Sequence, residues 1–338
     1  MGVFVFLPLV LPLTAWPVAR LAEQHLHPRT ATRLLTAMAA VLALCSTVCL
    51  GLVMVVGTAQ LPGNPLPDGW SDPEVRAAVP FDEVVGKAAI PALCAVVVAC
   101  TRALWRHARV RRQAHRALSG LPDTEVAVLP DGVPYAYALP GGGRRGGGAL
   151  HGGRLVGALR GSAGRPVRRR RGGRVVVTTA LLDRLRPAER RALFAHERAH
   201  LAARHDRFLL AVQLAARANP FLRPLRTAVA YTAERWADEE AARAIGSRRT
   251  VARAIGTAAL VSRGTPAPTL AGLAAPGPVP RRVAALLGPP PAVRNWPSVF
   301  TSVGLAAWGA AAGTAASAMS SANSAVTMVL ILHAATPF

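Results

Sequence analysis

The sequence predicts a mainly α-helical, polytopic membrane protein with about four transmembrane helices and one α+β domain between the third and the fourth. Composition supports this class, because 51% of the 338 residues are hydrophobic and only 17% are charged. A helix that crosses a bilayer needs roughly 20 predominantly apolar residues. Four stretches approach that length: Val3 to Ala19, Leu34 to Gly57, Val84 to Trp105 and Val299 to Met319.

The first and third stretches need separate arguments. The first is similar to a secretory signal, but Met1 to Phe6 carries no positive charge and basic residues begin only at Arg20. The third has Lys87 and Arg102 near its ends, where long basic side chains can reach the membrane surface. The predicted membrane regions are residues 1–105, with three spans, and residues 299–338, with the fourth span and a short extracellular tail.

Arginines predict the orientation, because short basic flanks of membrane spans stay in the cytoplasm. Basic residues follow the first and third stretches, whereas the loop of residues 58–83 is acidic and is expected outside. The amino terminus is therefore predicted outside and residues 106–298 form a cytoplasmic domain. Many arginines beside a single lysine suggest a GC-rich bacterial source, so the predicted location is the bacterial cytoplasmic membrane.

The formal charge of +23 raises the question of nucleic-acid binding. Nine arginines and no acids lie in the Gly-rich insert 140–173, and other arginines flank spans, where anionic lipid is the nearer partner. No helix-turn-helix, zinc-finger or aromatic RNA-binding pattern accompanies the charge. Direct nucleic-acid binding is therefore disfavoured, the lipid bilayer is a predicted partner, and the insert is predicted to be a flexible loop.

Short strand-like runs precede a series of helices in the cytoplasmic segment. Proline at the first helical position predicts a helix start at Pro187, Asn219-Pro220 predicts a helix end, and Gly246 closes a further helix. The expected strands are Glu125 to Leu129, Tyr135 to Leu139 and Arg174 to Thr179. The expected helices begin at Pro187, cover Phe208 to Ala216, and run from about Arg226 to Ile245.

The run Ala195-His196-Glu197-Arg198-Ala199-His200 carries the main chemical signal. Residues four apart share one face of a helix, so two imidazoles can bind one tetrahedral zinc ion while Glu197 reaches its open position. Zinc would acidify a water molecule, Glu197 would take the proton, and hydroxide would attack a peptide carbonyl. The alternative interpretation is two surface histidines on an amphipathic helix.

An acidic pair on a later helix contains the candidate for the third ligand, Glu234. Glu234 and Asp238 are four apart, which suits one metal ligand and one acceptor that orients a zinc-bound histidine. A solvated acidic face on a basic domain is the alternative interpretation.

A third histidine ligand is not expected. The three-histidine pattern would need a histidine where Asp206 stands and a glycine where Ala203 stands. His205 is therefore predicted to support the site from behind the ligands or to be structural. Besides zinc, the candidates for stabilising the transition state are Tyr231, Arg243 and His205.

These residues resemble those of a known group. Val175 to Leu182, Pro187 to Arg190, His196 to His200 and Glu234 to Asp238 are similar to segments of the BlaR/MecR-type membrane metallopeptidases and their HtpX-like relatives. The resemblance covers about Glu125 to Ile245. It implies a zincin-like α+β domain whose small sheet binds substrate at its edge, with one zinc ion on His196, His200 and Glu234, Glu197 as the catalytic acid/base, and Asp238 supporting the site.

The chain also departs from the antibiotic-sensing members of that group. Their penicillin-binding domain places a serine three residues before a lysine, but the single lysine here, Lys87, has Val84 at that spacing. β-Lactam sensing by that chemistry is not expected, and a signal would enter through the spans, the loop 58–83 or a partner. Gly309 and Gly313 form a small-residue stripe on which a partner helix could pack, although packing within the chain is the simpler use.

The predicted function is a membrane-bound zinc endopeptidase that hydrolyses a cytoplasmic or membrane-proximal protein. The resemblance suggests a transcriptional repressor as substrate, which is an analogy. One alternative is a signalling or scaffold protein that uses the zinc fold to bind a partner without turnover. Another is an anionic-lipid or nucleic-acid binder that acts through the charge of the insert.

Overall fold

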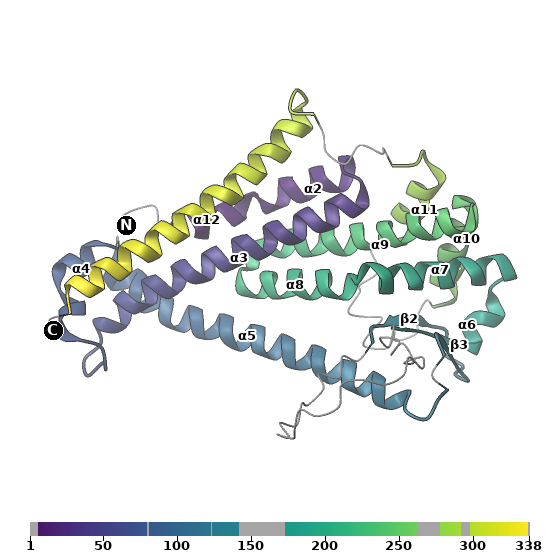
Figure 1. Ribbon diagram of the computed structural model, residues 1–338, viewed down its shortest axis with the longest axis horizontal. Helices are drawn as coiled ribbons and strands as arrows, with labels where there is room; N and C mark the ends of the chain where they lie inside the picture. The colour runs from purple at the N-terminus through teal and green to yellow at the C-terminus, as the bar shows by residue number, and fades with distance from the viewer. Residues whose placement is uncertain are drawn as a thin grey trace, which may run out of the picture.

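The structure is a computed structural model that describes residues 6–79, 81–122, 124–141, 173–262, 278–291 and 298–336. These residues are mainly helical and include one small mixed sheet. Figure 1 shows that the long helices α3, α5 and α12 come together near the carboxyl terminus, whereas the sheet lies toward the other end of the molecule. Most of the predicted Gly/Arg-rich insert, residues 142–172, falls outside the described residues, so its flexibility stays a prediction.

Three of the described helices are long and apolar enough to cross a membrane: α3 (Pro28–Ala59), α5 (Asp82–Ala117) and α12 (Ser302–Ala334). The second and third predicted spans lie within α3 and α5. Both α5 and α12 pack against α3. Gly57 of α3 and Gly86 of α5 allow a close backbone contact, because a Cβ atom on either glycine would collide with the other.

The first predicted span does not form one long helix. The described part of Val3 to Ala19 consists of α1 (Leu7–Val10), the 3-10 helix η2 (Leu11–Thr14) and the start of α2 (Ala15–His25). Pro8, Pro12 and Pro17 lack the amide hydrogen that a continuous helix requires, and each lies at or near the start of one of these short helices. The expectation of about four spans is therefore corrected to three membrane-length helices among the described residues.

The fourth predicted span begins and ends later than expected. Thr301 caps the start of α12 by accepting a hydrogen bond from the amide of Gly304 (3.0 Å), and the helix continues to Ala334 instead of ending at Met319. The residues after Met319 were expected to form a short tail, but Ser321 and Ser324 of α12 are buried, and Ser321 Oγ lies 3.4 Å from the carbonyl of Cys45 on α3. On the predicted small-residue stripe, Gly313 faces Leu11 of the same chain. A partner helix at Gly309 stays a prediction.

Short helices and polar contacts connect α3 to α5. The connection includes the 3-10 helix η3 (Asp68–Ser71) and α4 (Pro73–Ala77). Asp82, the first residue of α5, accepts hydrogen bonds from Gln60 Nε2 (3.0 Å) and from Arg76 Nε (2.6 Å). These polar contacts lie where the apolar helix α3 ends and the apolar helix α5 begins, so they mark one end of the apolar segments of both helices.

The predicted small sheet is confirmed, with the strands in the order β1-β3-β2. β1 (Val126–Leu129) pairs parallel to β3 (Arg174–Thr178), and β2 (Ala136–Leu139) pairs antiparallel to β3. One face of β3 packs through Val176 on the end of α5, and the other packs through Val177 on α6 (Thr179–Arg184) and its neighbours. Because β3 is the central strand, β2 lies at an edge of the sheet.

The helices of the domain are α7 (Pro187–Ala203), α8 (His205–Ala218), the 3-10 helix η4 (Pro220–Leu222), α9 (Arg223–Ile245), α10 (Arg248–Val261) and α11 (Val279–Leu287). The predicted start at Pro187 and the predicted ends before Pro220 and Gly246 are confirmed, whereas α8 and α9 begin three residues earlier than expected and α10 was not predicted. Gly246 ends α9 in the left-handed conformation (φ 73°), as its position predicted. Arg204 adopts the same conformation (φ 54°) between α7 and α8, and Figure 1 shows that α8 continues in roughly the direction of α7.

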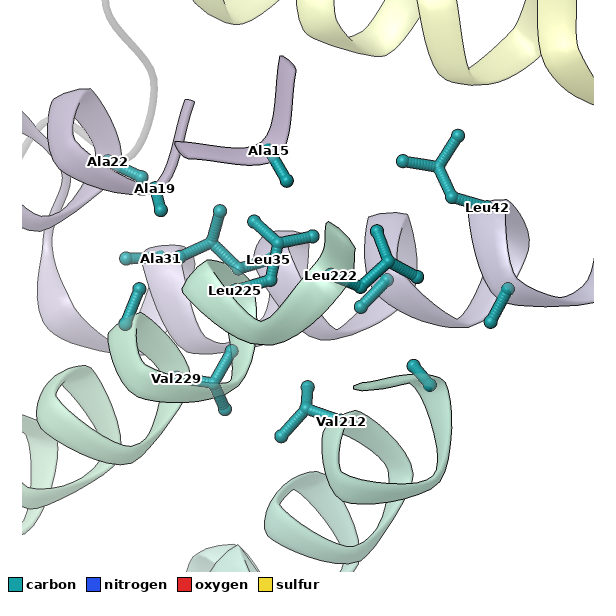
Figure 2. Packing of buried hydrophobic residues seen from close by; sticks show 14 residues of the cluster. Ala15, Ala19, Ala22, Ala31, Leu35, Leu42, Val212, Leu222, Leu225 and Val229 are labelled. Atoms are coloured by element: carbon teal, nitrogen blue, oxygen red, sulfur yellow. The ribbon is translucent and has the colours of Figure 1, made fainter. Parts of the chain in front are cut away.

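The core joins the domain to the membrane helices. The hairpin formed by α8, η4 and α9 packs against α3, and Figure 2 shows Val212, Leu222, Leu225 and Val229 of the hairpin beside α2 and α3. Ala15, Ala31 and Leu35 are among the buried residues that meet them. Small alanines on α2 and α3 allow these helices to approach the hairpin closely.

Candidate metal centre

Helix α7 positions the two motif histidines. It begins with Pro187, and the Glu189 carboxylate accepts a hydrogen bond from the Arg186 amide (3.0 Å), so its first turn is capped. His196 and Glu197 are buried, and His200 is half-buried. The histidines thus face the interior, which excludes the interpretation of two surface histidines.

Three ligand atoms converge from α7 and α9. Nε2 of His196 and Nε2 of His200 lie 3.1 Å apart, and each lies 3.5 Å from a carboxylate oxygen of Glu234. Zinc bonds of about 2.1 Å in tetrahedral geometry place the ligand atoms about 3.4 Å from one another. The observed separations therefore suit one such ion, and two imidazoles with one carboxylate are a donor set that zinc accepts.

Asp238 lies behind the first histidine, one helical turn after Glu234. Its Oδ1 lies 3.1 Å from Nδ1 of His196, while Nε2 of the same ring faces the ligand cluster. Asp238 is completely buried. This arrangement leaves Nε2 facing the cluster and is compatible with the supporting role that its spacing predicted.

Arg282 of α11 lies against both acids of the site, and no pattern in the sequence predicted this position. Its guanidinium donates to both oxygens of Asp238 (2.9 and 2.6 Å) and lies 2.9 Å from Glu234 Oε2. Burial alone would raise the pKa values of the two acids, but the charge of Arg282 is the largest of the opposing effects that lower both pKa values. In the sequence Arg282 is one arginine among many, with no neighbouring motif. Its burial in the structure distinguishes it from the others.

His205 lies directly behind the second histidine. Its Nδ1 is 2.8 Å from Nδ1 of His200, and its ring packs edge-on against Trp236, with centroids 4.7 Å apart. Burial first, and then the neighbouring His200, lower the pKa of His205 to about 2, so its ring is neutral. A metal on Nε2 of His200 leaves the proton on Nδ1, and His205 can accept it as a hydrogen bond.

The Glu197 carboxylate lies against the backbone of Ala138 on β2, whereas the metal-ligand candidates face one another. Burial raises the pKa of the Glu197 carboxyl to about 7, and a backbone hydrogen bond from Ala138 of β2 acts in the opposite direction. A carboxyl group with a pKa near neutrality can both accept and donate a proton. The helix therefore places a general acid/base candidate beside the sheet edge and next to the ligand cluster.

A cavity of about 830 Å³ opens onto these residues. Its walls are mostly apolar and come from β2, α8, α10 and α11, with Ile255, Ala258 and Val283 among the lining residues. Glu197, Glu234 and Arg282 also line it, so the cavity reaches the candidate metal centre. Such a cavity suits a ligand with apolar side chains and one polar group to be aligned.

The exposed edge of β2 borders the cavity. The amide of Thr178 donates to the carbonyl of Tyr135 (3.1 Å), and antiparallel pairing alternates bonded and non-bonded residues. By this alternation and the β2–β3 register, Tyr137 bonds to β3, whereas the backbone groups of Ala136 and Ala138 point away from β3. An extended peptide could pair with these groups.

Two of the proposed transition-state residues lie elsewhere. Tyr231 is buried beneath the guanidinium of Arg281, 4.1 Å from its ring centroid. Arg243 forms an exposed ion pair with Glu240 (3.0 Å). Neither lines the cavity, whereas His205 and Arg282 do. Spacing along a helix could not separate these residues, because the buried side of α9 extends almost all round the helix.

Comparison with known proteins agrees with this geometry. Residues 168–217 match the model of peptidase family M48. The M48-like segment contains both histidines and Glu197 on α7 and most of α8, but it ends before Glu234. No curated protein and no solved structure matched the chain. The match supports a zinc metallopeptidase related to the HtpX and BlaR types, and it does not distinguish the subtype.

Proposed function

We propose that this chain is a membrane-bound zinc endopeptidase of the HExxH type. The observation that carries the proposal is the convergence of His196, His200 and Glu234 on one point beside Glu197, at the end of a cavity. In this proposal the three residues hold one zinc ion. Asp238 orients the His196 imidazole through Nδ1 of His196, and His205 orients the His200 imidazole through Nδ1 of His200.

The chain's own groups account for the proton transfers of peptide hydrolysis. When bound, zinc supplies a Lewis acid that acidifies water and polarises the scissile carbonyl. Glu197 takes the proton from the attacking water and passes it to the amide nitrogen as the C–N bond breaks. Arg282 carries a positive charge and lines the cavity beside the cluster, so it can stabilise negative charge that develops on the substrate.

The substrate is proposed to bind as an added strand on β2. The outward-facing amide and carbonyl of Ala136 and the carbonyl of Ala138 supply backbone hydrogen bonds that do not depend on the substrate's sequence, while the amide of Ala138 bonds to Glu197. Side chains of the bound peptide then alternate between the apolar cavity and the opposite side. An internal segment of a protein fits such an edge, which supports endopeptidase activity.

The cellular role and orientation are also proposals. The basic flanks favour an outside amino terminus and a catalytic domain in the bacterial cytoplasm, so the substrate is a cytoplasmic or membrane-proximal protein. Cleavage of a transcriptional repressor within a signalling pathway rests on the resemblance alone.

The decisive test measures metal and turnover together. Detergent-purified wild type, His196→Ala and Glu197→Gln would be analysed for zinc and for cleavage of casein. We expect about one zinc ion per chain and cleavage for wild type, zinc without cleavage for Glu197→Gln, and neither for His196→Ala. Equal zinc in wild type and His196→Ala would contradict the metal site. Zinc without cleavage in wild type, across several protein substrates, would favour the binding-only alternative.

A further inference from the structure

The tip of the α8–η4–α9 hairpin combines an exposed aromatic ring with exposed positive charge. Phe221 is 54% exposed, and Arg217, Arg223 and Arg226 around it are also exposed. Within the described ranges, no carboxylate lies within ion-pair distance of these three arginines. The tip therefore presents an unneutralised basic surface around an apolar side chain.

The packing of the tip places it at a definite level along the membrane helices. Leu222 of the tip shares a buried cluster with Leu42 of α3, and Cys100 Sγ of α5 lies 3.8 Å from the carbonyl of Leu214. The Gln60–Asp82 hydrogen bond marks the opposite end of the apolar segments. Leu42 is 18 residues from Gln60, and Cys100 is 18 residues from Asp82, which corresponds to about 27 Å of helix.

The hydrocarbon core of a bilayer is about 30 Å thick. If the core begins near the Gln60–Asp82 level, it ends close to Leu42 and Cys100, where the hairpin tip lies. Other interfacial residues follow at this end: exposed Trp105 has Arg109 over its ring (5.2 Å), and exposed Trp16 has Arg20 over its ring (5.8 Å). Exposed tryptophan with arginine is typical of a membrane surface.

We infer that the hairpin tip inserts into the headgroup layer on the peptidase side and binds anionic phospholipid there. Phe221 enters the boundary of the acyl chains, while Arg217, Arg223 and Arg226 contact lipid phosphates. The inference depends on the proposed membrane position of α3, α5 and α12, but it requires neither zinc nor proteolysis.

The hairpin also connects this surface to the metal centre. α8 starts at His205, which contacts His200, and α9 carries Glu234 and Asp238 beyond the tip. Both arms pack on α3. Lipid bound at the tip would therefore hold the two arms that carry supporting and ligand residues.

Photo-crosslinking in proteoliposomes tests the inference. Phe221→p-benzoylphenylalanine would be compared with Leu287→p-benzoylphenylalanine, an exposed position at the end of α11, in vesicles of equal phosphatidylglycerol and phosphatidylcholine. Intact-mass measurement would count lipid adducts on each protein. We expect adducts at position 221 at least tenfold above position 287, with phosphatidylglycerol predominating. Equal, low yields at the two positions would overturn membrane insertion.

A charge variant tests the lipid class separately. Arg217→Gln/Arg223→Gln/Arg226→Gln would be combined with the 221 label, beside a control triple, Arg184→Gln/Arg249→Gln/Arg253→Gln, that removes the same exposed charge from α6 and α10. Each arginine near an anionic surface changes lipid affinity roughly fivefold. We expect the ratio of phosphatidylglycerol to phosphatidylcholine adducts to fall at least fivefold in the tip triple only. A ratio near one in the wild-type background, or the same fall in both triples, would overturn anionic recognition at the tip.

Discussion

The guanidinium of Arg282 donates hydrogen bonds of 2.9 and 2.6 Å to the Asp238 carboxylate. This pair links α11 to α9 at the residue that contacts Nδ1 of His196. Both side chains are buried, and Arg282 also lies against Glu234. The charge of one guanidinium is therefore shared by a candidate metal ligand and the residue that orients another.

We expect Arg282→Met to destabilise the fold and weaken metal binding. Removing one partner of a buried ion pair leaves uncompensated charge and typically costs about 3–5 kcal/mol. Loss of a group that supports metal ligands lowers affinity roughly 10–100-fold. Thermal unfolding and competitive zinc titration would measure the two effects. Arg243→Met, which removes only an exposed pair with Glu240, is the control and should cost less than about 1 kcal/mol. Similar effects of the two substitutions would contradict the assigned role of Arg282.

Zinc removal is expected to lower stability reversibly. Metal that binds only the folded chain adds about 4 kcal/mol when its free concentration is 1,000 times its dissociation constant. Chelation should therefore lower the midpoint of thermal unfolding, and added zinc should restore it. His200→Ala removes a ligand, so its midpoint should not respond to chelator or zinc. A response as large as that of wild type would show that the ion binds elsewhere.

Proline substitution in β2 separates substrate binding from folding. The amide of Ala138 points to the cavity and to Glu197, so Ala138→Pro should keep the sheet but lower kcat/KM by roughly 100-fold, with zinc retained. Tyr137→Pro removes an amide that pairs with β3 and should destabilise the domain itself. Unfolding midpoints and peptide cleavage would be compared. Full activity of Ala138→Pro would contradict a role of this amide, either in holding Glu197 or in binding substrate.

The apolar cavity should determine the side chain accepted beside the scissile bond. Ala258 is half-buried and lines the cavity on α10. Ala258→Phe would fill that space, and one lost methylene contact in an apolar pocket changes discrimination by roughly 10-fold or more. We expect kcat/KM to fall more for peptides with leucine or phenylalanine beside the scissile bond than for peptides with alanine at the same position. Thr257→Val, a neighbour absent from the lining, is the control; an equal fall for all peptides would contradict this subsite.

Local patterns were sufficient for most elements. The strands at β1, β2 and β3 and the helix boundaries at Pro187, Asn219 and Gly246 agree with the structure, because turn residues and caps act within a few residues. The described part of the first predicted span is a series of short helices for a reason that is also local, because Pro8, Pro12 and Pro17 interrupt the hydrogen bonds of a continuous helix. Helix α12 continues to Ala334, beyond the predicted end of the fourth span at Met319, because it packs along α3, where Ser321 is buried.

The sequence by itself determined the chemistry that is available: His196 and His200 one turn apart, Glu197 beside them, and an acidic pair at Glu234 and Asp238. These follow from helical periodicity, which spacing alone defines. Only the tertiary structure decided that Arg282 and His205 join the site, that Tyr231 and Arg243 do not, and that the edge of β2 faces Glu197. Contacts between elements far apart in the chain depend on how buried surfaces pack together, and no short run of residues encodes that packing.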